Sequence, residues 1–324
     1  MTCAVTCAEL PNEILRPIVR ALPRRRVLGA ERLEGGLSNV NYRVRLDGAP
    51  DVVLRRYARD PAACRKEAAL LALLGGTVPA PEVLYAAPDG EEGLAPFAVL
   101  RWVDGVTFRA LKQSGDRAAI AEAAASVGAA LAAIGRHGFD RGGWLEAGPR
   151  GLAVGAPLLD GPDAMPRFVD QCLASPYLAR RVPPALRDAV HALVWSRADR
   201  LTVLGGESRL AHGDFRKANV VVAERAGRWE VAAVLDWEFA VSGTPLADVA
   251  NFLRYERGGA SAVEPHFSRA FVDHGGALPD DWWPLSRVVD LVALCELLAR
   301  ERLPDDVAGE VVGLVRSTVE TTHA

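Results

Sequence analysis

Alternating apolar and polar residues predict an antiparallel sheet in the first third of the chain. Residues 40–46 alternate in this way, and their apolar positions are Val40, Tyr42, Val44 and Leu46. Asp47-Gly48 follows as a hairpin turn signal, and residues 52–55 begin the return strand. A later apolar run, residues 96–103, ends at another Asp-Gly pair and predicts a further strand.

Apolar residues at helical spacing dominate the rest of the chain. One such series is Ile120, Ala124, Val127, Leu131 and Ile134. Asp116 precedes this series in a position to cap the helix. Residues 168–173, 184–203 and 288–298 predict further helices, whereas residues 141–165 are rich in glycine and proline and predict a long loop.

A short hairpin predicts a cluster of oxygen-bearing side chains. Residues 220–235 form two strand-like runs joined by a short turn, with polar motifs at both ends. A tight strand pair brings its ends together, so Asp214, Asn219 and Asp236 are expected to converge. Such convergence suits phosphoryl transfer, because one carboxylate can orient an acceptor hydroxyl while an amide oxygen and a second carboxylate hold Mg²⁺ against nucleotide phosphates.

Two motifs carry a resemblance to known enzymes. His-Gly-Asp followed by Asn at residues 212–219, and Asp-Trp-Glu at residues 236–238, resemble the catalytic and metal-binding motifs of protein kinases. Gly213 replaces the kinase arginine, and Asp-Trp-Glu replaces Asp-Phe-Gly. With these replacements the chain resembles the aminoglycoside phosphotransferase and choline-kinase-like family, which implies a small-molecule kinase.

The resemblance also implies an architecture. The expected fold is a two-lobed, protein-kinase-like α+β fold with a mainly antiparallel β N-terminal lobe. This nucleotide-binding lobe would span residues 1–100, and residues 101–105 would form a hinge. A mostly helical C-terminal lobe for catalysis and acceptor binding would span residues 106–324.

In the catalytic half, the resemblance assigns a role to each polar residue of the motifs. Asp214 is expected to act as the base or hydroxyl-orienting group, and Arg216 to reach the transferred phosphate. Asn219 and Asp236 are expected to hold Mg²⁺. His212 is expected to support the loop rather than to transfer protons.

In the nucleotide-binding half, the resemblance implies contacts to the phosphates. Gly35 and Gly36 would let backbone amides approach a phosphate, and Ser38 would add a hydroxyl donor. Arg55 stands where kinases have a strand cation, and Glu67 stands where a helix glutamate holds that cation in place. The family commonly has lysine there; arginine keeps the charge but offers a forked set of donors.

The hinge implied by the resemblance would bind the nucleotide base. Leu100 would be the gatekeeper, and the backbones of Arg101 and Val103 would pair with the base. Backbone recognition leaves little trace in the side chains, so the donor is expected to be ATP or GTP. Farther along the chain, Asp248 is expected to hydrogen-bond the backbone of the catalytic loop.

The acceptor stays open among three alternatives. The first is an aminoglycoside or another natural product, and the second is a metabolite such as choline, an amino alcohol, a sugar or an amino acid. The third is a catalytically silent nucleotide-binding relative, which Arg55 motivates. Asp290 and Glu296 are candidates to receive the amine of a cationic acceptor, with solvated surface acids as the alternative. An aromatic cage would favour a quaternary amine.

Composition adds bounds on partners and location. The chain has 324 residues, 50% of them hydrophobic, and a net charge of -3 with dispersed basic residues. No nucleic-acid or membrane partner is therefore expected, and neither a signal peptide nor a membrane anchor. Five cysteines, an odd number without metal-ligand spacing, indicate reduced thiols and a cytoplasmic protein. The oligomeric state stays open.

Overall fold

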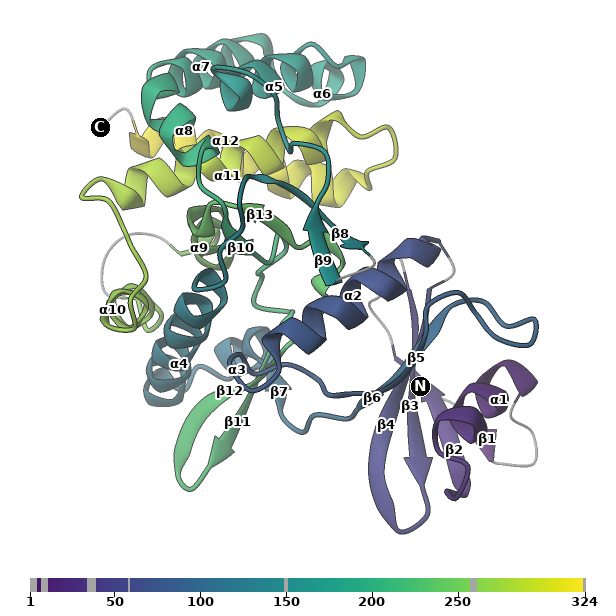
Figure 1. The fold of residues 1–324 in the computed structure, drawn as a ribbon. Helices are drawn as coiled ribbons and strands as arrows, with labels where there is room; N and C mark the ends of the chain where they lie inside the picture. The colour runs from purple at the N-terminus through teal and green to yellow at the C-terminus, as the bar shows by residue number, and fades with distance from the viewer. Residues whose placement is uncertain are drawn as a thin grey trace. The chain divides into compact units, whose positions relative to one another are not determined.

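The chain folds into two compact units, whose elements are labelled in Figure 1. The computed structural model describes residues 5–6, 11–33, 39–57, 59–148, 151–256 and 261–322. Unit 1 comprises residues 1–110, 146–153 and 219–238, and unit 2 comprises residues 111–145, 154–218 and 239–324. The expected lobe boundaries at residues 101–105 stay a prediction. Unit 1 also includes two segments that come later in the chain, residues 146–153 and 219–238.

Unit 1 contains the antiparallel sheet that the alternating pattern predicts. Its six strands lie in the order β1-β2-β3-β4-β6-β5, and every neighbouring pair is antiparallel. The strands are β1 (Val5–Thr6), β2 (Val27–Arg32), β3 (Val40–Leu46), β4 (Ala49–Arg56), β5 (Val83–Ala87) and β6 (Phe97–Arg101). The predicted strands at residues 40–46, 52–55 and 96–103 are confirmed. The sheet thereby fixes the position of Arg55 near the end of β4.

Two helices pack on this sheet. Helix α1 (Asn12–Ala21) contacts β4, β5 and β6, and its Ile18 is fully buried with Val44 and Leu54 of the sheet. Helix α2 (Pro61–Leu74) contacts β5 and β6. It begins at Pro61, because the Asp60 side chain caps it by accepting a hydrogen bond from the backbone N–H of Ala62.

The predicted hairpin is confirmed as strands β11 (Val220–Arg225) and β12 (Arg228–Val234). Ala226 and Gly227 both have positive φ, at 50° and 78°, as a tight two-residue hairpin turn requires. Strand β7 (Val106–Thr107) extends this sheet beside β11. The backbone N–H of Leu235 donates to the carbonyl of Asn219 at 2.8 Å, so the two ends of the hairpin lie side by side.

Unit 2 is mainly helical. Its helices are α4 (Arg117–Gly135), α5 (Ala164–Leu173), α6 (Pro176–Arg181), α7 (Pro184–Trp195), α8 (Ala198–Gly205), α9 (Pro245–Leu253), α10 (His266–Asp273), α11 (Trp282–Ala299) and α12 (Asp305–Thr322), with α3 (Phe108–Ser114) at the unit boundary. The predicted helices after Asp116 and over 168–173 and 288–298 are confirmed. The single helix expected over 184–203 is instead two, because the chain leaves the helical path at Ser196-Arg197.

The prediction of a long loop over residues 141–165 is wrong. The segment contains strands β8 (Gly143–Gly148) and β9 (Gly151–Val154), and β8 pairs with β13 (Val241–Gly243), which pairs with β10 (Arg209–Ala211). A Cβ on Gly143 would lie 2.7 Å from the carbonyl oxygen of Ala156. The glycine therefore permits close backbone approach beside a strand, which composition alone did not distinguish from a loop.

Helix α4 is long and apolar enough to cross a membrane by length and composition, and it is the one such helix among the described residues. Val127 and Leu131 of this helix are fully buried inside unit 2. The side chain of Asp116 caps it by accepting from the N–H groups of Ala118 and Ala119, both at 3.1 Å. Its burial is that of a helix at the centre of a packed core.

Gly128 allows helix α10 to lie directly on α4. A Cβ at this position would lie 2.2 Å from the carbonyl oxygen of Phe267 and 3.0 Å from the amide nitrogen of Phe271. Both atoms belong to the backbone of α10, so a side chain cannot rotate away to make room. The two helices must separate if residue 128 gains a methyl group.

We therefore expect Gly128→Ala to destabilise unit 2 by about 1–3 kcal/mol through overpacking. Gly313→Ala in α12 is the matched control, since nothing lies within 4 Å of its added Cβ. There the helix propensity of alanine should stabilise the protein by about 0.5–1 kcal/mol. Chemical denaturation of both variants checks the pair, and equal midpoints would contradict the close contact of α4 with α10.

Candidate functional site

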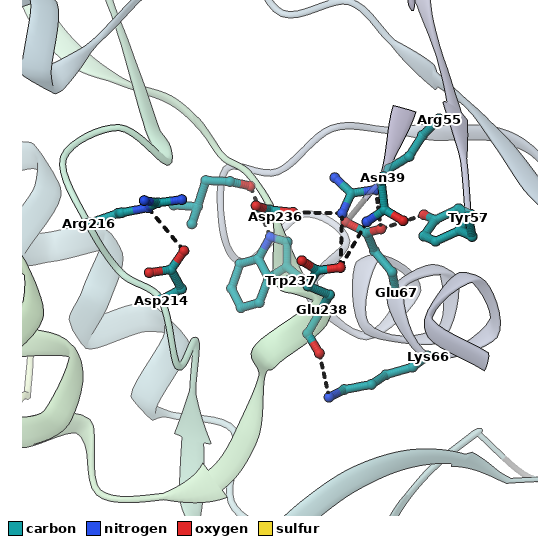
Figure 2. A network of polar contacts seen from close by, with 11 residues as sticks. Asn39, Arg55, Tyr57, Lys66, Glu67, Asp214, Arg216, Asp236, Trp237 and Glu238 are labelled. Carbon is teal, nitrogen blue, oxygen red and sulfur yellow. Dashed lines mark hydrogen bonds and ion pairs between the residues drawn. The ribbon is translucent and has the colours of Figure 1, made fainter. Parts of the chain in front are cut away.

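A buried arginine stands at the centre of a polar cluster in unit 1, shown in Figure 2. Arg55 is only 6% exposed on β4. Its Nε lies 3.0 Å from Oε2 of Glu67 on α2, and its Nη2 lies 2.6 Å from Oδ1 of Asp236. The same Nη2 lies 3.9 Å from Oε2 of Glu238. The structure thus brings together the predicted strand cation, the helix glutamate and the aspartate that follows the hairpin.

Electrostatics keep Arg55 charged despite its burial. Burial opposes the charged form, but the nearby carboxylates of Glu67 and Asp236 hold the pKa of Arg55 above its ordinary value. The contact of Nε with Glu67 is an ion pair without hydrogen-bond geometry, and among the described residues this N–H has no hydrogen-bond acceptor. The guanidinium therefore faces a carboxylate on each side, with Glu67 at Nε and Asp236 at Nη2.

Tyr57 completes this cluster, although the sequence did not point to it. Its hydroxyl donates to Oε2 of Glu67, and the guanidinium of Arg55 lies 5.4 Å from its ring centroid. Burial raises the pKa of Tyr57 well above its ordinary value, so the hydroxyl stays protonated and keeps donating. Its position two residues after Arg55, on the same face of the extended chain, is the signal that could have indicated it.

The segment Asp236-Trp237-Glu238 is held in place by several side chains of unit 1. Nδ2 of Asn39 donates to Oε2 of Glu238 at 2.8 Å, and Nζ of Lys66 donates to the carbonyl of Glu238 at 2.9 Å. The fully buried indole of Trp237 donates to the carbonyl of Val234 at 2.9 Å. Asp236 itself has a φ of 70°, a strained conformation that the surrounding contacts maintain.

The residues predicted to hold Mg²⁺ have suitable donor atoms. Asn219 is buried at one end of the hairpin, and Asp236 lies at the other end with a partly exposed carboxylate. Amide and carboxylate oxygens are ligands that Mg²⁺ prefers. No group of three or more His, Cys, Asp or Glu side chains suited to a metal occurs within the described ranges. The pair therefore fits an ion completed by nucleotide phosphates and water, rather than an all-protein cage.

Unit 2 contains the loop with His212, Gly213 and Asp214. Gly213 has a φ of 78°, and a Cβ there would lie 2.2 Å from the carbonyl oxygen of Phe239, so only glycine fits. The carboxylate of Asp248 accepts from the N–H groups of His212 at 2.6 Å and Gly213 at 3.0 Å. The predicted support of the loop by Asp248 is confirmed. Burial raises the pKa of Asp248 to about 7, although both N–H groups oppose this shift.

The side chain of Asp214 points toward Arg216, as Figure 2 shows. Nε of Arg216 lies 3.1 Å from Oδ2 of Asp214, and the arginine side chain is 54% exposed. The backbone N–H of Asp214 donates to Nδ1 of the buried His212 at 3.2 Å, a contact that supports the loop as expected. The convergence of Asp214 with Asn219 and Asp236 stays a prediction, because Asp214 belongs to unit 2 and the other two to unit 1.

Lys217 is a further support of this loop that sequence reasoning missed. Its amine donates to the carbonyl of Phe252 and lies 3.1 Å from Oε1 of Glu256. Lys112 pairs with the same oxygen of Glu256. Burial lowers the pKa of Lys217 to about 8, while Glu256 partly restores it. The signal was a lysine in a chain that otherwise uses arginine for nearly all its basic residues.

The predicted hinge residues lie at the end of β6. Leu100 is buried opposite Val53 of β4. The backbone N–H of Arg101 donates to the carbonyl of Glu82 at 2.9 Å. If Arg101 pairs with a base, it would therefore do so through its own carbonyl oxygen. Val103 follows the strand and is partly buried.

The predicted phosphate-contacting residues Gly35, Gly36 and Ser38 lie outside the described residues. Asn39 follows them directly and is buried against Glu238 through the hydrogen bond described above. Their roles therefore stay a prediction.

The candidates for binding a substrate amine already have arginine partners. Asp290 is 5% exposed, and its two oxygens accept from Nε of Arg254 at 2.9 Å and from Nη2 at 2.7 Å. Glu296 pairs with Arg300 at 2.9 Å on the exposed side of α11. The expectation of a solvated surface acid fits Glu296, whereas Asp290 is neither solvated nor unpaired. The helical spacing around Asp290 could not reveal this partner, because Arg254 lies at the end of a different helix, α9.

We expect Arg55→Ala to destabilise the protein by about 3–5 kcal/mol, because it leaves buried carboxylates without their shared cation. Arg55→Lys should recover most of this loss, since it keeps the charge at the strand. Arg26→Ala removes an arginine from an exposed ion pair with Asp47 and should cost much less. Denaturation midpoints check the series; an Arg55→Ala variant as stable as Arg26→Ala would contradict the central place of Arg55.

Solved structures share this fold over almost the whole chain. A ternary complex of aminoglycoside phosphotransferase APH(4)-Ia with ADP and hygromycin B is 20% identical, with a TM-score of 0.65 over 94% of this chain and 97% of that chain. The GDP and kanamycin complex of APH(2")-IIIa is 16% identical, with a TM-score of 0.66 over 96% of this chain and 99% of that chain. A putative aminoglycoside phosphotransferase from Ralstonia eutropha is 16% identical, with a TM-score of 0.66 over 96% of this chain and 98% of that chain. The expected protein-kinase-like α+β fold is confirmed.

Curated relatives match a short segment only. Acyl-CoA dehydrogenase family member 11 from Homo sapiens is 50% identical over 46 residues, and the same protein from Pongo abelii is 48% identical over 46 residues. These matches cover 14% of this chain and 6% of each relative's length.

The family comparison covers most of the chain. The phosphotransferase enzyme family matches residues 29–282, which include Arg55, Glu67, the loop of residues 212–219 and the hairpin. Together with the shared fold, this match confirms the predicted resemblance. The chain therefore belongs to the phosphotransferase enzyme family.

Proposed function

We propose that the chain transfers the γ-phosphate of ATP or GTP to a hydroxyl of a small molecule, with Mg²⁺ as cofactor. The observation that carries this proposal is the meeting of Arg55, Glu67 and Asp236 in unit 1. Kinases use a strand cation and a helix glutamate to hold nucleotide phosphates, and an aspartate to hold the metal. Bound nucleotides in the similar solved structures support the same reading.

Arg55 is suited to bind phosphate in this scheme. Glu67 and Tyr57 hold its guanidinium in place, and its Nε–H lacks a hydrogen-bond acceptor within the described residues. Its contact with Asp236 joins the phosphate-binding cation to the metal-binding carboxylate before any nucleotide binds. Mg²⁺, when bound by Asn219 and Asp236, would neutralise charge on the phosphates.

Asp214 is the residue proposed to act on the acceptor. Its carboxylate would orient the hydroxyl and take its proton as the new oxygen–phosphorus bond forms and the bond to the β–γ bridging oxygen breaks. Asp248 and His212 hold the backbone of the loop, which leaves the Asp214 carboxylate partly exposed for this work. Arg216 is proposed to steady charge beside it.

The catalytically silent alternative has weaker support. It rested on arginine in place of lysine at residue 55. Arg55 nevertheless makes the ion pair with Glu67 that the lysine would make, and Asp214, Asn219 and Asp236 are all retained. An active enzyme is therefore the better-supported proposal.

A nucleotide-consumption screen tests the proposed function. It would offer ATP and GTP separately with aminoglycosides, amino alcohols, sugars and hydroxy acids, and would include magnesium-free reactions. Acceptor-dependent consumption that requires Mg²⁺ is the expected result. Nucleotide binding without transfer to any acceptor would favour the silent alternative instead.

We expect Asp214→Asn to lose about 10²- to 10⁴-fold in turnover, because a neutral amide cannot take the hydroxyl proton. Nucleotide binding should persist, since Asn is nearly isosteric. Asp188→Asn on the exposed side of α7 makes the same chemical change away from the loop and should behave as wild type. Single-turnover measurements avoid masking by product release. A loss below about threefold would contradict the base role.

We expect Asp236→Asn to remove most of the Mg²⁺ dependence of nucleotide binding, since it takes away the charged ligand of the pair. Titrating nucleotide with and without Mg²⁺ measures this effect without requiring turnover. The Arg55–Glu67 ion pair should keep unit 1 folded, which circular dichroism can verify. A variant that retains the wild-type difference between the two titrations would show that Asp236 does not hold the metal.

A further inference from the structure

Two features that could bind a cationic acceptor, among the described residues of unit 2, are each filled by an arginine of the chain. The carboxylate of Asp290 receives the fork of Arg254. The ring of Trp283 has the guanidinium of Arg287 over it, 4.4 Å from the centroid. An ammonium group of a substrate would therefore have to displace a guanidinium in either place.

The other carboxylates around the catalytic loop also have partners. Glu256 pairs with Lys112 and Lys217, and Asp248 accepts from two backbone N–H groups. Asp214 pairs with Arg216. In this cluster each acid is thus already neutralised or hydrogen-bonded, and a cationic acceptor would find no unpaired carboxylate among them.

Arg254, directly after α9, and Arg287 of α11 form one hydrogen-bonded group. Burial lowers the pKa of Arg254, but Asp290 raises it above its ordinary value, and Asp214 also contributes to the rise. Arg254 therefore lies within electrostatic range of Asp214. Arg287 donates to the carbonyls of Arg254 at 2.9 Å and Glu256 at 2.6 Å, which fixes the group in place. Arg254 and Arg287 are thus both held by acceptors of the chain itself.

Arg216, which pairs with Asp214, differs from these arginines because it is open to a ligand. Its side chain is more than half exposed, whereas the side chain of Arg254 is 17% exposed. It contacts Asp214 through Nε, so this guanidinium already receives a carboxylate in the structure. A guanidinium presents a planar fork that matches a carboxylate in two parallel hydrogen bonds.

We propose that the acceptor is a hydroxy acid, whose carboxylate binds Arg216 while its hydroxyl is held by Asp214. This proposal rests on the proposed function. The carboxylate of the acceptor takes the place of Asp214 on the guanidinium, and Asp214 is thereby released to accept the hydroxyl proton. The guanidinium of Arg216 favours an anion over the ammonium group of an amino alcohol or an aminoglycoside.

The test compares matched acceptors. Hydroxy acids of three to six carbons would each be offered beside the diol and the amino alcohol of the same length, together with an aminoglycoside. The expected kcat/KM is about 10- to 100-fold higher for the hydroxy acid than for its diol, as one charge-assisted contact provides. The amino alcohol should be the poorest of the three.

Arg216→Gln separates this role from one toward the transferred phosphate. The variant should raise KM for the hydroxy acid about 10- to 100-fold and leave KM for the diol within about twofold. An equal fall in kcat for every acceptor would assign Arg216 to the phosphate and overturn the proposal. Arg225→Gln is the control, because Arg225 is 57% exposed and pairs with Glu230 at 3.2 Å, much as Arg216 pairs with Asp214.

The outcomes distinguish this inference from the proposed function. Transfer to amino alcohols or aminoglycosides in preference to hydroxy acids would overturn the inference and leave the kinase function standing. If no acceptor is turned over, binding decides: hydroxy acids should raise the melting temperature of wild type with a non-hydrolysable nucleotide, but not that of Arg216→Gln. Equal shifts in both proteins, or none in either, would overturn the hydroxy-acid assignment.

Discussion

A single buried guanidinium links three carboxylates that come from separate segments of unit 1. Glu67 lies on α2, and Asp236 and Glu238 follow the hairpin. Without Arg55 these acids would repel one another in a site that excludes most water, and the sheet, the helix and the hairpin end would lose their common partner. A lysine has one nitrogen for this task, whereas the fork of arginine contacts Glu67 and Asp236 through different nitrogens. The choice of arginine is thus structural as well as electrostatic.

The catalytic loop follows a different principle, because its shape depends on backbone contacts. Asp248 accepts from two N–H groups, Lys217 reaches a carbonyl, and Gly213 leaves room for Phe239. The residues that support the loop are buried, whereas Asp214 and Arg216 are partly exposed. Rigid support beneath an accessible pair is what positioning of an acceptor requires.

Local signals were sufficient for three strands of the sheet and for the hairpin, because alternation and turn residues act over short distances. The ion pair of Arg55 with Glu67 was expected from the resemblance instead. Partners chosen by tertiary packing were not predictable. Nothing in the spacing of α11 indicates that Asp290 would receive Arg254, and the strand at Gly143 was hidden because its glycine serves a close approach of two backbones. Tyr57 is an intermediate case. Its position two residues after Arg55 was visible in the sequence, but its hydrogen bond to Glu67 was not.

The chain has only three lysines, Lys66, Lys112 and Lys217. Lys66 donates to the carbonyl of Glu238, and Lys112 and Lys217 share Glu256. Every lysine amine thus supports either the segment after the hairpin or the base of the catalytic loop. Acylating reagents directed at lysine would therefore modify these two places and leave the arginine-rich exterior untouched. Of the three, Lys217 is buried, so the rate of its acylation would report how often the base of the loop opens to solvent.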